Sequence, residues 1–86
     1  MAKENGKFTI SVLNESGVVY YGDCSVLFVP ALHDTIAILA HHTPMIAKLG
    51  PGEVSIKIGR EKQDIATIKS GLLYVGNNEA TVLVNL

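Results

Sequence analysis

Residues 34–54 read DTIAILAHHTPMIAKLGPGEV, and this stretch decides much of the fold. Two short apolar runs, 35–39 and 45–49, flank a polar corner that ends in Thr43-Pro44. The proline fixes its own φ, and the residue before a proline is confined to extended backbone. The second run ends at Gly50-Pro51-Gly52, where glycines are free to adopt positive φ. We therefore expect two strands joined by a rigid bend and followed by an obligatory turn.

Outward from this stretch, the chain alternates between apolar and polar residues in short runs. Phe8, Ile10 and Val12 fall on one face of such a run, which predicts a half-buried strand. The run 53–58 predicts Val54, Ile56 and Ile58 inward, with Glu53, Ser55 and Lys57 outward. Strands are expected at 8–13, 18–21, 24–29, 35–39, 45–49, 53–58, 64–68, 72–75 and 80–86. We expect all of them to pair antiparallel.

Turn residues separate these runs. Asn and Gly at 76–78 tolerate the left-handed conformation, which is typical of a hairpin. Turns are also expected at Gly22-Asp23 and over the charged tip 59–63, and no window has a helical period. The sequence therefore predicts an all-β fold, a flattened antiparallel β-sandwich or barrel of two sheets and about nine to ten short strands. Residues 1–7 are expected to be a flexible N-terminus, with 8–86 forming a single domain.

Composition limits the function. The chain has 86 residues, a hydrophobic content of 48% and a formal net charge of −1. No apolar run reaches the 18 or so residues that cross a bilayer, and the start lacks a signal peptide's apolar segment. We expect a soluble, cytoplasmic protein with a partner that covers part of its apolar surface. The seven basic residues are dispersed, which argues against nucleic-acid binding.

A metal site would have to use Cys24, His33, His41, His42 and Met45. His41 and His42 are adjacent, so in extended chain they point to opposite faces. The spacings Cys-x-x-Cys and His-x-x-x-His are absent. We therefore expect no metal and no cofactor, with Cys24 as a small buried side chain. A small metal carrier using His33, His41 and Cys24 remains the minor alternative.

Catalytic motifs are also missing. Ser70-Gly71 does not form a Gly-x-Ser-x-Gly elbow, and no Gly-Lys-Ser/Thr follows the Gly50-Pro51-Gly52 turn. Hydrolysis would need a nucleophile, a base and an orienting acid together. We expect no catalysis by this chain alone. The residues by themselves favour a small β-domain that binds a protein.

At the central stretch the sequence resembles the N-terminal β-sandwich of the epsilon subunit of F-type ATP synthases, called delta in mitochondria. That family has Gly-x-Leu-Gly-Ile-Leu/Tyr-Pro-x-His-Ala/Thr-Pro-Leu followed by Leu-x-Pro-Gly, and residues 34–45 and 49–54 are similar to it. The flanks are similar too, with Tyr21-Gly22 before a strand, a Ser-Gly-apolar run at 70–75 and the run 77–83. The order and spacing hold from Phe8 to Leu86.

The departures from the family pattern are local. Asp34 and Ala37 replace family glycines, while Ala40 and His41 replace a proline and its neighbour. Asp visits the left-handed region more readily than most residues, so Asp34 is expected to keep the turn. Thr35 stands where the family often carries an acidic residue. Family members commonly continue into a two-helix C-terminal domain, so we expect either a naturally short form or an isolated domain.

The resemblance implies a non-catalytic rotor subunit of the central stalk. Such a subunit binds gamma, rests on the ring of c subunits and couples ion translocation to ATP synthesis. It would lie peripherally on the cytoplasmic side of the cell membrane, or the equivalent face in an organelle. Facing the c-ring would be Leu32, His33, Asp34 and Thr35. Facing gamma would be Asn14, His42, Met45 and Ala47. The alternative is a free-standing β-sandwich protein-binding module of unrelated lineage.

Overall fold

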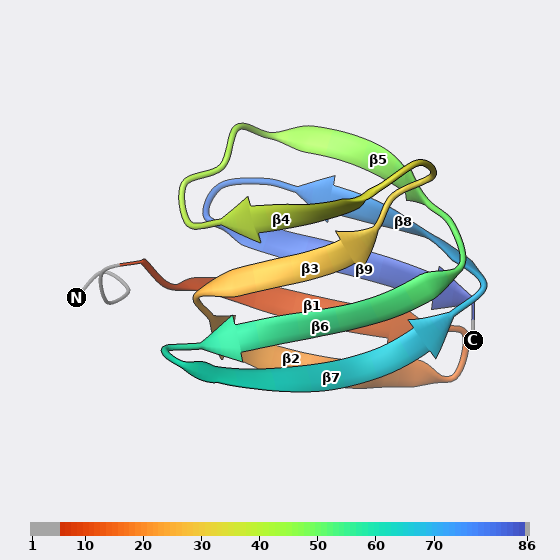
Figure 1. The fold of residues 1–86 in the computed structure, drawn as a ribbon, viewed down its shortest axis with the longest axis horizontal. Coiled ribbons are helices and arrows are strands. Elements are labelled where there is room, and N and C mark those ends of the chain that lie inside the picture. The colour runs from red at the N-terminus through yellow and green to blue at the C-terminus, as the bar shows by residue number, and fades with distance from the viewer. Residues whose placement is uncertain (1–5, 86) are drawn as a thin grey trace.

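The computed structural model describes residues 6–85, and within that range the chain forms nine strands and no helix (Figure 1). This confirms the predicted all-β class. The strands are β1 Phe8–Asn14, β2 Gly17–Cys24, β3 Val26–Pro30, β4 Thr35–Leu39, β5 Met45–Leu49, β6 Gly52–Ile58, β7 Glu61–Ile68, β8 Ser70–Val75 and β9 Glu79–Asn85. Within residues 6–85, no helix is long and apolar enough to cross a membrane. The predicted flexible segment lies, for residues 1–5, outside the described residues.

Two sheets face each other across one core, as predicted for a sandwich. One has five strands in the order β2-β1-β9-β8-β5, and the other has four in the order β4-β3-β6-β7. β4 and β5 belong to different sheets, so the corner between them carries the chain from one sheet to the other (Figure 1). The bend is therefore a passage between layers and not a hairpin.

The pairing is antiparallel throughout the described strands except between β1 and β9, which run parallel. The expectation of purely antiparallel pairing was wrong at this pair. β1 and β9 are the first and last strands, so no short hairpin turn fixes their relative direction. Alternation within one strand carries no information about such a distant neighbour.

The predicted turn at Gly22-Asp23 was also wrong. β2 continues through both residues, which pair with β1, and Thr9 Oγ1 donates to Asp23 Oδ1 at 2.8 Å. The chain leaves the five-stranded sheet at Ser25, whose N–H donates to the carbonyl of Lys57 at 2.7 Å. The change of sheet thus needs only one residue.

The charged tip is shorter than predicted. β6 and β7 stay paired as far as Ile58 and Glu61, so only Gly59 and Arg60 form the turn. Gly59 has φ 63°, which allows so tight a reversal. Lys62 lies on the strand, with its Nζ 5.4 Å from the ring centroid of Phe28.

The core lies between the sheets and follows the predicted alternation closely. Phe8, Ile10 and Val12 are buried, as are Ala80, Val82 and Val84 of β9. Ser55 is the exception, because it is buried where the alternation predicts an outward side chain. The register of β6 and β7 shifts between Val54 and Ser55, where Ile65 of β7 has no partner in the pairing, so the extra residue of this bulge lies in β7 and not in β6. The inward position predicted for Leu86 lies outside the described residues.

We expect a far-UV circular dichroism spectrum of the β-sheet type and one cooperative unfolding transition. The reason is that both sheets share one buried cluster, so neither can keep its apolar face covered without the other. Thermal melts followed by circular dichroism and by tyrosine fluorescence should coincide. Two separated transitions would contradict a single cooperative domain.

Candidate protein-binding edge

The two long sides of the sandwich differ in how their edge strands are protected. β7 ends the four-stranded sheet on one side and exposes the charged or polar residues Glu61, Lys62, Gln63 and Asp64. Natural proteins place such side chains on edges to prevent unwanted strand pairing. On the other side, residues 35–47 contain no Asp, Glu, Lys or Arg. We call residues 35–49, which form β4, the corner and β5, the β4–β5 edge.

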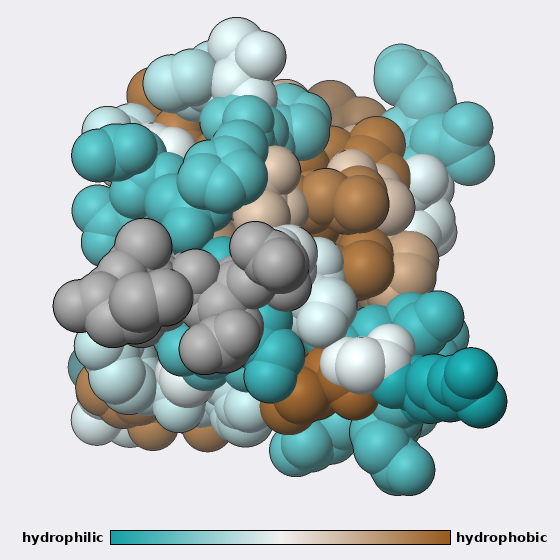
Figure 2. Space-filling model, turned by 90° about the vertical axis from the view of Figure 1, so that its left-hand side faces the viewer, coloured by the Kyte–Doolittle hydropathy of each residue, from teal (hydrophilic) through white to brown (hydrophobic). Residues whose placement is uncertain are grey.

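The β4–β5 edge exposes apolar side chains. Leu39 is 54% exposed and Ile46 is 70% exposed, although both lie in strands. Figure 2 looks at the corner end of the molecule, where hydrophobic surface lies open between polar side chains. An edge that is apolar and carries no charged residue from 35 to 47 is suited to being covered by another protein. Ile46 was missed by the sequence analysis, although alternation along 45–49 could have identified it as the outward residue.

The corner is held more firmly than its proline alone requires. His41 has φ 63°, in the left-handed region that costs an L-residue on the order of 1–2 kcal/mol. Its N–H donates to Oδ1 of Asn78, at 2.9 Å, in the turn between β8 and β9. Thr43-Pro44 predicts the stiffness from the sequence, whereas this bond has no signal there.

Three of the four residues expected to face gamma lie on this edge. His42 is half-buried, and its Nδ1 lies 2.7 Å from the carbonyl oxygen of Thr43. Because a carbonyl oxygen can only accept a hydrogen bond, Nδ1 is the donor in this bond, and Nε2 takes no part in it. Met45 and Ala47 are half-buried and pack against the core, so less of each side chain is available than of Ile46.

The structure does not bring Asn14 to the same place. β1 is separated from β5 by β9 and β8, and Asn14 lies at the far end of β1 from the corner (Figure 1). Its Oδ1 accepts the N–H of Ser16 at 2.8 Å, which stabilises the turn into β2. His42, Met45 and Ala47 therefore lie together on the β4–β5 edge, and Asn14 lies alone at the opposite end of the sandwich.

The four residues expected to face the c-ring do lie together, all exposed, in the loop between β3 and β4 and the first residue of β4. The N–H of Ala31 donates to the carbonyl of Asp34 at 2.8 Å, and the N–H of Gly50 donates to the carbonyl of Pro30 at 2.8 Å. Among the described non-glycine residues, positive φ occurs at His41 and Asn78. The expectation that Asp34 keeps its turn in the left-handed region was therefore wrong, because the Ala31–Asp34 bond closes the turn without it.

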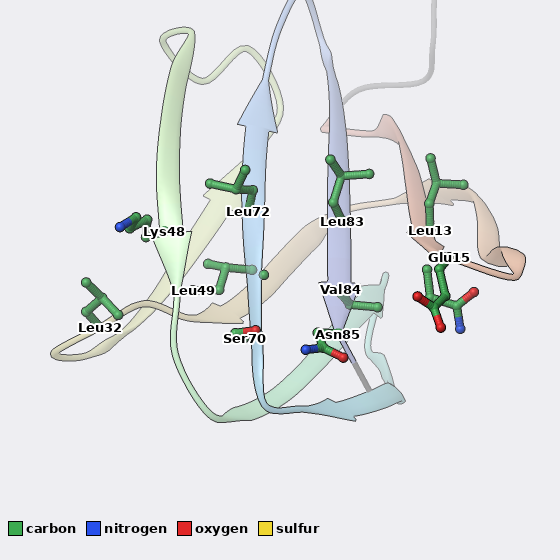
Figure 3. A pocket seen from close by; sticks show the side chains of 12 residues that line it. Leu13, Glu15, Leu32, Lys48, Leu49, Ser70, Leu72, Leu83, Val84 and Asn85 are labelled. Atoms are coloured by element: carbon green, nitrogen blue, oxygen red, sulfur yellow. The ribbon is translucent and has the colours of Figure 1, made fainter.

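An apolar groove of about 700 Å³ crosses this loop end of the five-stranded sheet. Figure 3 shows Leu32 and Lys48 on one side, Leu72 and Leu83 in the middle, and Leu13 and Glu15 on the other side. Asn14 also lines it, so the groove joins one residue expected to face gamma to one expected to face the ring. No pattern in the sequence indicates the groove, because its five leucines come from five separate strands and loops.

The three residues of the metal-carrier alternative are far apart. His33 precedes β4 and His41 follows it, so they lie at opposite ends of an extended strand, while Cys24 is buried in the core. Among the described residues, no group of three His, Cys, Asp or Glu side chains could hold a metal ion. Burial raises the pKa of the Cys24 thiol to about 12, with Asp23 adding to the rise.

We expect Cys24 to react with a thiol reagent at neutral pH only when the chain unfolds. The folded thiol has its pKa raised from 9.0 to about 12, so it stays protonated and shielded. Because the folded pKa is the higher one, the thiol's contribution to stability is complete below pH 9 and is lost toward pH 12. Ellman titration with and without urea measures the reactivity, and rapid labelling of the folded chain would contradict the burial.

A family model described as ATP synthase, Delta/Epsilon chain, beta-sandwich domain matches residues 7–86. An ATP synthase epsilon chain of Latilactobacillus sakei is 32% identical over 99% of this chain, which spans 60% of that relative. One of Chlorobaculum tepidum is 25% identical over 96% of this chain and 94% of the relative.

Solved structures have the same fold. A chain of the Euglena gracilis mitochondrial ATP synthase structure described as OSCP/F1/c-ring gives a TM-score of 0.83 at 13% identity, over 96% of this chain and 53% of that one. A chain of the Tetrahymena thermophila structure described as central stalk/c-ring gives 0.73 at 13% identity, over 99% of this chain and 67% of that one.

Proposed function

The chain belongs to the delta/epsilon β-sandwich family of ATP synthases, and from this premise we propose that it is a non-catalytic subunit of the central stalk. In that role it binds the gamma subunit and the c-ring and couples ion translocation to ATP synthesis. Curated relatives carry the name ATP synthase epsilon chain, which supports the proposal. Membership of the family also excludes the alternative of an unrelated lineage.

The observation that carries the gamma contact is the difference between the two edges. The β4–β5 edge has no charged residue from 35 to 47 and exposes Ile46 and Leu39, whereas the β7 edge is charged. Its corner is fixed by Pro44 and by the His41–Asn78 bond, so the surface needs little ordering on association. We assign gamma to this edge through His42, Met45, Ala47 and the newly identified Ile46.

The c-ring contact is assigned to the loop end. Leu32, His33, Asp34 and Thr35 are exposed there, at the opposite end of the sandwich from the corner. The molecule is 36 Å long and 22 Å wide, so the two contacts are separated by the long dimension. Asn14 lies at the loop end, so a gamma contact at this residue is separate from the contact on the β4–β5 edge. Membrane association follows only through the complex, on the cytoplasmic side of the cell membrane or the equivalent face in an organelle.

The test is co-purification from native membranes. A tagged full chain expressed in its own cell is expected to bring down gamma and c subunits together after mild detergent extraction. The Ile46→Asp variant should lose gamma, while a variant on the opposite edge, Gln63→Ala, should keep it. Recovery of the tagged chain without either subunit would contradict the proposed function.

A further inference from the structure

We propose that Asn78 is a positioning residue for the gamma-binding edge, although it lies in a different turn and outside that edge. It holds His41 in the left-handed conformation and so fixes the corner that carries His42 into β5. The inference rests on the proposed function for its partner, but the contacts that support it belong to this chain alone.

Asn78 joins three segments that are distant in the sequence. Its Oδ1 accepts the N–H of His41 at 2.9 Å, across 37 residues. Its Nδ2 donates to the carbonyl of Lys7 at 3.2 Å, across 71 residues. Its own carbonyl accepts the N–H of Thr9 at 3.4 Å. One half-buried side chain therefore fastens the corner to the start of β1 and to the β8–β9 turn.

The conformation of His41 needs such a bond. The corner, residues 40–44, contains no glycine, and an L-residue at φ 63° is unfavourable unless its surroundings maintain it. Asn78 itself has φ 52°, which asparagine tolerates better than most residues. Two left-handed residues thus meet through one hydrogen bond, and removing the amide takes that support from the conformation of His41.

The link to binding is the direction of the next residues. His42 follows His41 directly, and its Nδ1 is 2.7 Å from the carbonyl of Thr43, so the ring moves with the corner backbone. A corner that samples other conformations presents His42 and the start of β5 correctly for only part of the time. The apparent affinity for gamma falls by that fraction.

The experiment compares three variants of the full chain. Asn78→Gly tolerates the left-handed backbone but removes both side-chain bonds, while Asn78→Asp keeps an acceptor for His41 N–H. Asn77→Gly is the matched control, since Asn77 is exposed in the same turn. We expect Asn78→Gly to bind purified gamma about fivefold more weakly, as for the loss of its one hydrogen bond to the corner, with Asn78→Asp and Asn77→Gly within about twofold of the unaltered chain.

A second readout separates positioning from general destabilisation. Amide exchange of His41, followed by NMR on the free chain, is expected to accelerate in Asn78→Gly and stay slow in Asn77→Gly. In a background of His42→Asp, the additional effect of Asn78→Gly on gamma binding should shrink, because the two act through one corner.

The outcomes distinguish the two claims. If the unaltered chain does not bind gamma, the proposed function fails, and the role of Asn78 in fixing the corner is still measured by the His41 amide. The positioning role is overturned if amide exchange of His41 stays slow in Asn78→Gly. It is also overturned if Asn78→Gly weakens gamma binding by the same factor in the unaltered chain and in the His42→Asp background.

Discussion

Replacing Gly52 by alanine is expected to lower the free energy of unfolding by about 3 kcal/mol. Gly52 has φ 154°, which L side chains rarely adopt, and an added Cβ would lie 2.6 Å from Cβ of Pro30. Pro30 is buried at the end of β3 and its ring cannot rotate away. Urea denaturation followed by circular dichroism measures the loss. The effect tests whether the Gly50-Pro51-Gly52 turn organises the fold as the sequence predicts.

Gly17→Ala is the matched control for this prediction. Gly17 also has positive φ, at 132°, but an added Cβ would meet nothing within 4 Å. It should therefore lose only the backbone term, about 1 kcal/mol. Equal losses in the two variants would contradict the contact with Pro30 as the cause.

Ile46→Asp is expected to weaken gamma binding by about 2 kcal/mol, roughly 30-fold, while leaving the fold intact. The side chain is 70% exposed on the edge strand β5, so a carboxylate there stays in water in the free chain. In the complex the carboxylate would be buried without a partner. His42→Asp should act in the same direction. Isothermal titration against purified gamma measures both, with thermal melts as the check on folding.

Packing contacts decide which other substitutions test binding alone. Met45 packs against the core, so Met45→Asp is expected to destabilise the chain as well as the complex. On the opposite edge, Lys62 lies over the ring of Phe28, so replacing it would also remove a contact within the chain. The double variant Arg60→Ala with Gln63→Ala avoids this and is the control. If this control loses gamma while Ile46→Asp and His42→Asp retain it, the binding face is wrongly assigned.

What could be predicted from the sequence is what local chemistry determines. β4 and β5 have the bounds expected from their apolar runs, and β5 is bounded directly by Pro44 and Gly50. The left-handed Asn78 was expected from its turn. The parallel pairing of β1 with β9 and the passage between sheets at Ser25 depend on distant partners, so no alternation within one strand could indicate them.

The candidate site shows the same division. The resemblance grouped Asn14 with His42, but the pairing order of the sheet separates them. Ser55 is buried although the alternation of Val54 and Ile56 predicts an outward side chain, and no pattern within β6 indicates this. The His41–Asn78 bond joins residues 37 apart and has no signal in either segment alone. Ile46 was identified as a candidate gamma contact from its exposed side chain in the structure, and the family pattern did not indicate it.

The most direct test of the gamma-binding edge is amide hydrogen exchange of the full chain with and without purified gamma. We expect slower exchange on binding in residues 39–49, with no change in residues 61–65 of β7. Protection confined to β7 and β2, or no protection anywhere at saturating gamma, would contradict it.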